Sequence, residues 1–107
     1  RMGELSVADL KRMMDAQEAF ELIDVRTPAE VDQARIEGAT LLDEAAYEQL
    51  LELPRETRLV FICHHGPRGE NAARQFVSEG FTDVHNVVGG IDAWSQEIDL
   101  RPSVESF

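Results

Sequence analysis

The chain has 107 residues, of which 43% are hydrophobic, so it is long enough for one domain with a single buried core and too short for two. Ten lysines and arginines stand against 21 aspartates and glutamates, and the resulting net charge of −11 argues against nucleic acid or an anionic membrane as a partner. No apolar run approaches the roughly 20 residues that a membrane-spanning helix needs, which indicates a soluble globular protein.

The first residue and the cysteine content suggest a cellular context. We expect residues 1–107 to form one domain, and the start at Arg1 rather than at methionine indicates a processed product or a segment excised from a longer chain. A lone cysteine cannot form an internal disulfide. Because this is compatible with a reducing compartment, we expect a cytoplasmic protein.

The first half of the chain alternates short apolar runs with helical patterns. Ser6, with Asp9 three residues later, predicts a helix start. Apolar residues follow it at helical spacing, namely Val7, Leu10, Met13 and Met14. The run FELIDV (20–25) predicts a buried strand, and the proline after it predicts a short helix over residues 28–34.

The middle of the chain repeats this alternation. ATLL (39–42) predicts a second strand, and EAAYEQLLEL (44–53) predicts a helix that ends at Pro54. RLVFI (58–62) predicts a third strand. Its nearly continuous apolar character is typical of a central parallel strand that is covered on both faces.

The last part predicts a helix, a strand and a further helix. From Arg68 onward an apolar stripe indicates a helix, with Gly80 at the C-terminal cap. VHNV (84–87) predicts the next strand, and two glycines then turn the chain into a helix over 91–98. Strands separated by helices need crossover connections, so the chain predicts an α/β fold with a parallel sheet and helices on both faces. Ligands of such sheets bind beyond the carboxyl ends of the strands.

Cys63 stands at the carboxyl end of the third predicted strand, just before a loop that opens a helix. The first N–H groups of that helix lack intrahelical partners and converge on the loop, an arrangement that favours an anion such as a thiolate. Gly66 permits the turn that aims the amides inward, and Arg68 adds positive charge. A lone cysteine after an apolar strand is also commonly a small buried hydrophobe, so both interpretations stand at this point.

Three blocks of the sequence closely resemble the rhodanese-like, or sulfurtransferase, domain family. They are LIDVRTPAEVDQARIEGA, CHHGPRG and GFTDVHNVVGGIDAWS, in the family's order over nearly the whole chain. The resemblance implies a five-stranded parallel sheet and a cysteine that carries a persulfide sulfur. It makes Cys63 the catalytic cysteine. The substrate-binding loop that it implies consists of His64, His65, Gly66, Pro67 and Arg68. Further family positions are matched by Asp24, Arg26, Gly38, Ala39, Gly89, Gly90, Ala93 and Trp94.

The chain departs from the family pattern at three places. Arg35 replaces a common histidine, at a position that we interpret as structural. Pro67 has no N–H and removes one donor from the loop. Gly69 stands where serine is common and removes a hydroxyl beside the helix start. The last two differences bear on catalytic strength.

The loop is one residue shorter than in the cell-cycle phosphatases and arsenate reductases that the fold also resembles. The shorter loop suits a single sulfur atom, so the resemblance implies sulfur transfer without a metal or organic cofactor. A donor such as thiosulfate or a persulfide would load Cys63. A thiol acceptor such as glutathione, thioredoxin or a glutaredoxin-like protein, or cyanide, would remove the sulfur. The alternative function is a non-catalytic rhodanese module that acts as an interaction or regulatory domain.

Two histidines follow the cysteine directly. Consecutive residues seldom converge on one ion, so a metal site at Cys63, His64 and His65 is disfavoured. Either one imidazole faces the pocket and gains charge as the pH falls toward 6, or both are solvated. We interpret Trp94 as a packing residue, and Asp24 and Arg26 as a pair that holds the strand end to its loop.

Overall fold

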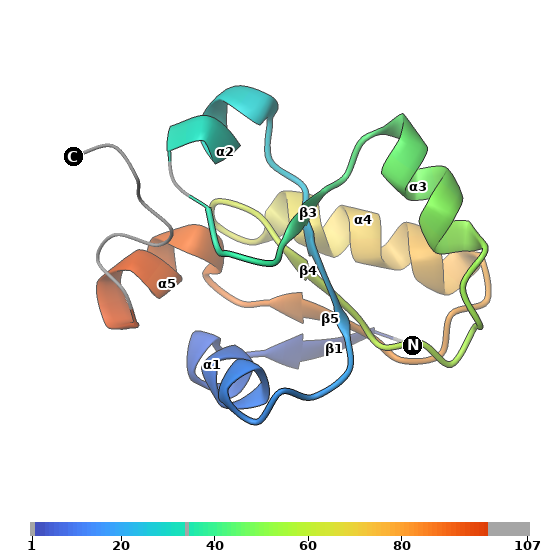
Figure 1. Cartoon of the computed structure of the whole chain (residues 1–107), viewed down its shortest axis with the longest axis horizontal. Helices are drawn as coiled ribbons and strands as arrows, with labels where there is room; N and C mark the ends of the chain where they lie inside the picture. The colour runs from blue at the N-terminus through green and yellow to red at the C-terminus, as the bar shows by residue number, and fades with distance from the viewer. Residues whose placement is uncertain (1, 34, 99–107) are drawn as a thin grey trace.

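Five strands and five helices alternate along the chain in the computed structural model, which describes residues 2–33 and 35–98 (Figure 1). The strands are β1 (Met2–Leu5), β2 (Glu21–Asp24), β3 (Thr40–Leu41), β4 (Leu59–Ile62) and β5 (Val84–Val87). The helices are α1 (Val7–Asp15), α2 (Pro28–Gln33), α3 (Glu44–Leu51), α4 (Pro67–Ser78) and α5 (Gly90–Glu97).

The strands form one sheet in the order β1-β5-β4-β2-β3, and every neighbouring pair is parallel. The central strand β4 pairs with both β2 and β5, and all four of its residues are buried. The parallel five-stranded α/β fold expected from the sequence is therefore confirmed. We call the side where the five strands end the carboxyl edge, and the side where they begin the amino edge.

Alternate residues of each strand face opposite layers of helices, because side chains point to opposite faces of a strand. On one face, α1 and α5 cover the strands. The core on this face consists of Val7, Leu10, Met13, Leu22, Ile36, Val60, Ile62, Val87, Ile91 and Trp94. On the other face, α3 and α4 cover them, with a core of Ile23, Leu50, Leu59, Phe61, Ala73, Phe76, Phe81 and Val84. Figure 1 shows the two layers on either side of the sheet, with α2 beside its carboxyl edge.

Local signals set most helix boundaries as predicted. Ser6 caps α1 with a reciprocal bond to Asp9, and the Asp43 carboxylate accepts from the N–H of Ala46 at the start of α3. The predicted glycine stop of α4 is confirmed, since Gly80 follows the helix with a φ of +102°. α3 ends at Leu51 rather than 53, because the residue before Pro54 is disfavoured in a helix.

The periodicity of the sequence predicted no strand over the residues that form β1. Its four residues include a glycine and a glutamate and have no apolar alternation, so only pairing with β5 makes them a strand. A Cβ at Gly3 would lie 2.6 Å from His85 Nδ1, so any larger residue there would force the imidazole to move. β3 is shorter than the predicted 39–42, and residue 34, the expected end of α2, lies outside the described residues.

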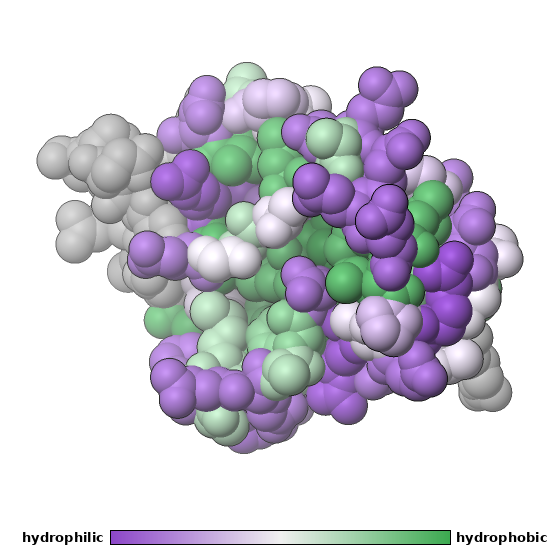
Figure 2. Space-filling view, turned by 45° about the vertical axis from the view of Figure 1, so that its right-hand side comes forward, coloured by the Kyte–Doolittle hydropathy of each residue, from purple (hydrophilic) through white to green (hydrophobic). Residues whose placement is uncertain are grey.

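The surface is of mixed polarity. Figure 2 shows hydrophilic residues over much of one face, with apolar residues between them near its middle. Val88, in the loop after β5, is 51% exposed. In the described part of the chain, no helix combines the length and the apolar character needed to cross a membrane.

Candidate functional site

Cys63 lies directly after β4 and is fully buried. The backbone N–H of Gly66 donates a hydrogen bond of 2.9 Å to Cys63 Sγ. An N–H that points at sulfur stabilises negative charge on it more than it stabilises the neutral thiol. The sulfur is therefore buried, as the hydrophobe interpretation requires, and it also accepts a backbone hydrogen bond, as the loop geometry predicted for a nucleophile requires.

The loop after Cys63 turns sharply into α4. Gly66 caps this helix with a φ of +130°, a conformation that favours glycine, and Pro67 occupies the first helical position. The carbonyl of Gly66 accepts from the N–H of Glu70 at 2.9 Å. As a result, the N–H of Gly66 is directed at the sulfur while its carbonyl is directed into the helix.

The start of α5 holds the opposite side of the loop. The N–H of Ile91 donates to the carbonyl of Cys63 at 2.7 Å, and the N–H of Asp92 donates to that of His64 at 3.0 Å. A Cβ at Gly90 would lie 2.1 Å from the oxygen of Cys63, so the loop and α5 approach closely only because this residue is glycine. The sequence indicated a turn at the paired glycines, but it did not show that the residues after this turn bind the carbonyls of Cys63 and His64.

Arg68 forms a bidentate pair with Glu30, a residue of α2 that the sequence analysis did not single out. Its Nη1 and Nη2 lie 2.9 and 3.0 Å from the two carboxylate oxygens of Glu30. The Arg68 hydrogen bond is the largest of the effects that lower the pKa of Glu30 from 4.5 to about 2, and the same bond raises the pKa of Arg68. The detectable signal was the Thr27-x-x-Glu30 pattern, which forms a capping box at α2.

Asp24 and Arg26 form a buried ion pair at the end of β2. Their side chains are 2% and 3% exposed, and Arg26 Nη2 lies 2.7 Å from Asp24 Oδ2. Arg26 Nη1 also donates to the backbone oxygen of Glu30 at 3.4 Å. The pair therefore fastens the strand end to the first turn of α2, the role expected from the sequence.

His64 and His65 are both exposed, and their rings pack edge to face with centroids 4.1 Å apart. His65 Nδ1 lies 3.9 Å from Asp92 Oδ2. The described residues contain no group of three or more His, Cys, Asp or Glu side chains that could hold a metal ion. Trp94 is 5% exposed and packs in the core with α1, which confirms the packing role.

Gly69 lies against a buried polar side chain of β5. A Cβ at Gly69 would come within 2.4 Å of Asn86 Oδ1, an atom that has no hydrogen-bond partner among residues 2–33 and 35–98. Asn86 is 5% exposed. The missing hydroxyl at position 69 therefore has a structural reason, since a serine would need Asn86 to move.

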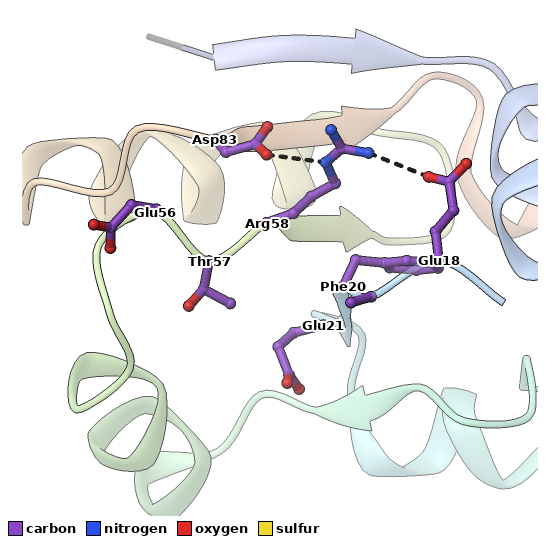
Figure 3. Close-up of a pocket in the computed structure, with 8 residues that line it drawn as sticks. Glu18, Phe20, Glu21, Glu56, Thr57, Arg58 and Asp83 are labelled. Carbon is purple, nitrogen blue, oxygen red and sulfur yellow. Dashed lines mark hydrogen bonds and ion pairs between the residues drawn. The ribbon is translucent and has the colours of Figure 1, made fainter.

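A hollow of about 560 Å³ lies at the amino edge, away from Cys63 (Figure 3). Figure 3 shows Arg58 between two carboxylates, Asp83 at 3.0 Å and Glu18 at 3.4 Å. The other lining residues are Ala19, Phe20, Glu21, Glu56 and Thr57. The described residues that line this hollow include no cysteine or histidine, and the hollow lies where strands begin.

Comparisons with known proteins agree with this geometry. The family described as the rhodanese-like domain matches residues 6–97. The chain is 30% identical over 93 residues to thiosulfate sulfurtransferase GlpE of Shewanella oneidensis, covering 86% of this chain and 91% of that protein. It is 34% identical over 93 residues to YrkF of Bacillus subtilis, covering 86% of this chain and 50% of YrkF. The chain thus spans about half the length of that relative.

The fold agrees with a solved structure of similar size. The crystal structure of a rhodanese-like domain protein from Staphylococcus aureus superposes with a TM-score of 0.79 at 24% identity. The match covers 98% of this chain and 100% of the other. At this identity the likeness concerns the fold.

Proposed function

The chain belongs to the rhodanese-like family, and we propose that it is a sulfurtransferase that carries sulfane sulfur as a persulfide on Cys63. The observation that carries the proposal is the bond from the N–H of Gly66 to Cys63 Sγ, in a loop with four residues between Cys63 and Arg68. A buried structural cysteine needs no such donor. The name of the relative GlpE supports thiosulfate as one donor.

Transfer to the protein is a nucleophilic displacement at sulfur. The Cys63 thiolate attacks the outer sulfur of the donor and forms an S–S bond, while the donor's own bond to that sulfur breaks. The electron pair of the broken bond leaves with sulfite, if the donor is thiosulfate, or with a thiolate, if the donor is a persulfide. The Gly66 N–H, already directed at Sγ, would stabilise the charge as it moves through the loop.

Transfer from the protein reverses the displacement with a different partner. An acceptor thiolate or cyanide attacks the outer sulfur of the persulfide, and the electron pair of the S–S bond returns to Cys63 as its thiolate. No redox cofactor is needed for either step. The acceptors that we propose are glutathione, thioredoxin or a glutaredoxin-like protein, in a reducing compartment such as the cytoplasm.

Intact mass spectrometry tests the proposal. After incubation with thiosulfate and gel filtration, the wild type should gain the mass of one sulfur atom, and Cys63→Ser should gain none. Addition of glutathione should restore the original mass. An unchanged wild-type mass with both thiosulfate and a persulfide donor would contradict sulfur carriage and favour the alternative of a non-catalytic interaction or regulatory module.

A further inference from the structure

The guanidinium of Arg68, the last residue of the proposed donor-binding loop, is near enough to interact electrostatically with Cys63 and is already paired with Glu30. Nη1 and Nη2 of Arg68 bond the two oxygens of one carboxylate at 2.9 and 3.0 Å. These are the two parallel N–H groups with which an arginine recognises an oxyanion. A sulfonate oxygen of thiosulfate must therefore displace Glu30 before it can bind Arg68 in the same way.

Glu30 is held in this position by contacts on its other side. Its Oε1 also accepts from the N–H of Thr27 at 2.8 Å and from the Thr27 hydroxyl at 3.2 Å. Its backbone oxygen accepts from Arg26, whose partner Asp24 is buried at the end of β2. Thr27 thus holds the carboxylate, and Arg26 holds the backbone of Glu30 to the end of β2, while the Arg68 and Glu30 side chains themselves are 45% and 36% exposed.

The charge of the donor decides how much this pair matters. Thiosulfate carries two negative charges. When a thiolate attacks it, the reacting complex carries three negative charges. The persulfide of an uncharged thiol carries at most one negative charge, so its complex with the attacking thiolate carries at most two. With Arg68 neutralised by Glu30, the pair supplies little net attraction for the more highly charged donor.

We propose that Glu30 sets the charge class of the sulfur donor. Because Glu30 pairs with the Arg68 guanidinium, it disfavours dianionic thiosulfate and favours sulfane donors of lower charge, such as the persulfide of an uncharged thiol. This inference rests on the proposed function. In the favoured reaction the Cys63 thiolate bonds to the outer sulfur of R–S–S–H, the S–S bond of the donor breaks, and R–S⁻ leaves with the electron pair while the proton stays on the transferred sulfur.

The experiment compares two donors on the same variants. Rates of Cys63 persulfide formation are measured by intact mass with thiosulfate and with the freshly prepared persulfide of N-acetylcysteine methyl ester. The readout is the ratio of the thiosulfate rate constant to the persulfide rate constant. Glu30→Gln keeps an acceptor for Thr27 but releases the charge of Arg68, so the ratio should rise about tenfold over wild type.

Two controls separate this mechanism from a general charge effect. Glu70→Gln removes the same charge from the first turn of α4, where its carboxylate bonds Arg74, and should leave the ratio within about twofold of wild type. In the double variant Glu30→Gln/Arg68→Ala the gain should disappear, because it acts through Arg68. An equal gain in Glu70→Gln, or a gain that survives loss of Arg68, would overturn the proposal.

The ratio also remains informative if Glu30→Gln loosens the loop. Loosening slows both donors alike and leaves the ratio at the wild-type value, which would overturn the role of Glu30 as a selector and assign it to positioning only. Sulfur loading by neither donor in the wild type would instead contradict the proposed function itself. The two failures are therefore distinguishable.

Discussion

Both edges of the sheet carry arginine–carboxylate pairs, but the pairs differ in burial and in the backbone around them. At the carboxyl edge, the Asp24 and Arg26 side chains are 2% and 3% exposed. At the amino edge, the Asp83 and Arg58 side chains are 33% and 38% exposed and border an open hollow. The same two residue types thus form part of the core at one edge and part of a solvated surface at the other.

The backbone explains why only one edge holds a candidate site. In a parallel sheet with helical crossovers, strands end where helices begin, so unpaired N–H groups and the positive helix ends gather at the carboxyl edge. Here the N–H of Gly66 points at Cys63 and the N–H of Ile91 holds its carbonyl. At the amino edge helices end, and carbonyl groups gather there instead. Chain direction alone therefore makes one edge suited to a thiolate.

The largest expected effect comes from breaking the buried pair. Asp24→Asn leaves the Arg26 guanidinium buried without its carboxylate, which should lower the free energy of unfolding by about 3–5 kcal/mol. Asp83→Asn, its counterpart at the amino edge, should cost about 1 kcal/mol or less, because that pair is partly exposed. Urea unfolding of both variants measures the difference. Equal losses would show that burial does not distinguish the edges.

The next effect concerns the contact between α5 and the loop that follows Cys63. Gly90→Ala places a Cβ against the carbonyl of Cys63 at a φ of +60°, and we expect a loss of about 2–4 kcal/mol with slower sulfur loading. Gly38→Ala is the matched control, since its φ is +90° but no atom of the described residues would lie within 4 Å of its Cβ. It should cost only backbone strain, about 1 kcal/mol. Thermal melts that coincide for the two variants would contradict the close approach.

Removal of one arginine from each edge tests where the charge matters for activity. Arg68→Ala leaves the Glu30 carboxylate without its counter-charge, so it should slow thiosulfate use by about one to two decades, the equivalent of ~1.5–3 kcal/mol, and should also slow alkylation of Cys63. Arg68→Lys should recover part of this, since an ammonium keeps the charge but lacks the planar fork. Arg58→Ala, at the amino edge, should change the rate by less than about twofold. Coincident Arg68→Ala and wild-type kinetics would exclude a role of Arg68 in thiosulfate use and in the reactivity of Cys63.

The smallest expected effect is a pH dependence of stability from Glu30. Its pKa is about 2 in the folded chain against 4.5 ordinarily, so the ion pair with Arg68 stabilises the fold above pH 4.5, and this contribution disappears as the pH falls from 4.5 toward 2. Glu30→Gln lacks this dependence. The wild type should therefore be the more stable at pH 6, and most of the difference should be lost by pH 2, where half of the Glu30 carboxylates are protonated. Melting temperatures over this range measure it, and a gap at pH 2 as large as that at pH 6 would contradict the shift.

Much of the architecture could be predicted from local pattern. The apolar run of β4, the capping box at Ser6 and the glycine stop of α4 are signals that act within a few residues, and each is found where predicted. The strand-to-helix position of Cys63 also follows from local pattern, because parallel connections place such loops at the carboxyl edge.

Other features depended on residues far apart in the chain. β1 is a strand because β5 supplies its partners, and no periodicity marks it. Glu30 lies 38 positions before Arg68, and nothing local to either residue announces their pairing. The same holds for Gly69 and Asn86, whose contact explains the missing hydroxyl.

The sequence by itself thus determined the α/β class, the direction of the sheet and the place of the only cysteine, because these follow from the spacing of apolar residues and from caps and turns. The tertiary structure alone decided what surrounds that cysteine. In the folded chain one N–H points at Sγ, two loop carbonyls accept hydrogen bonds from α5, and Arg68 pairs with Glu30. The physical reason is range: backbone propensity acts over neighbouring residues, whereas hydrogen bonds between elements form only after packing has brought their ends together.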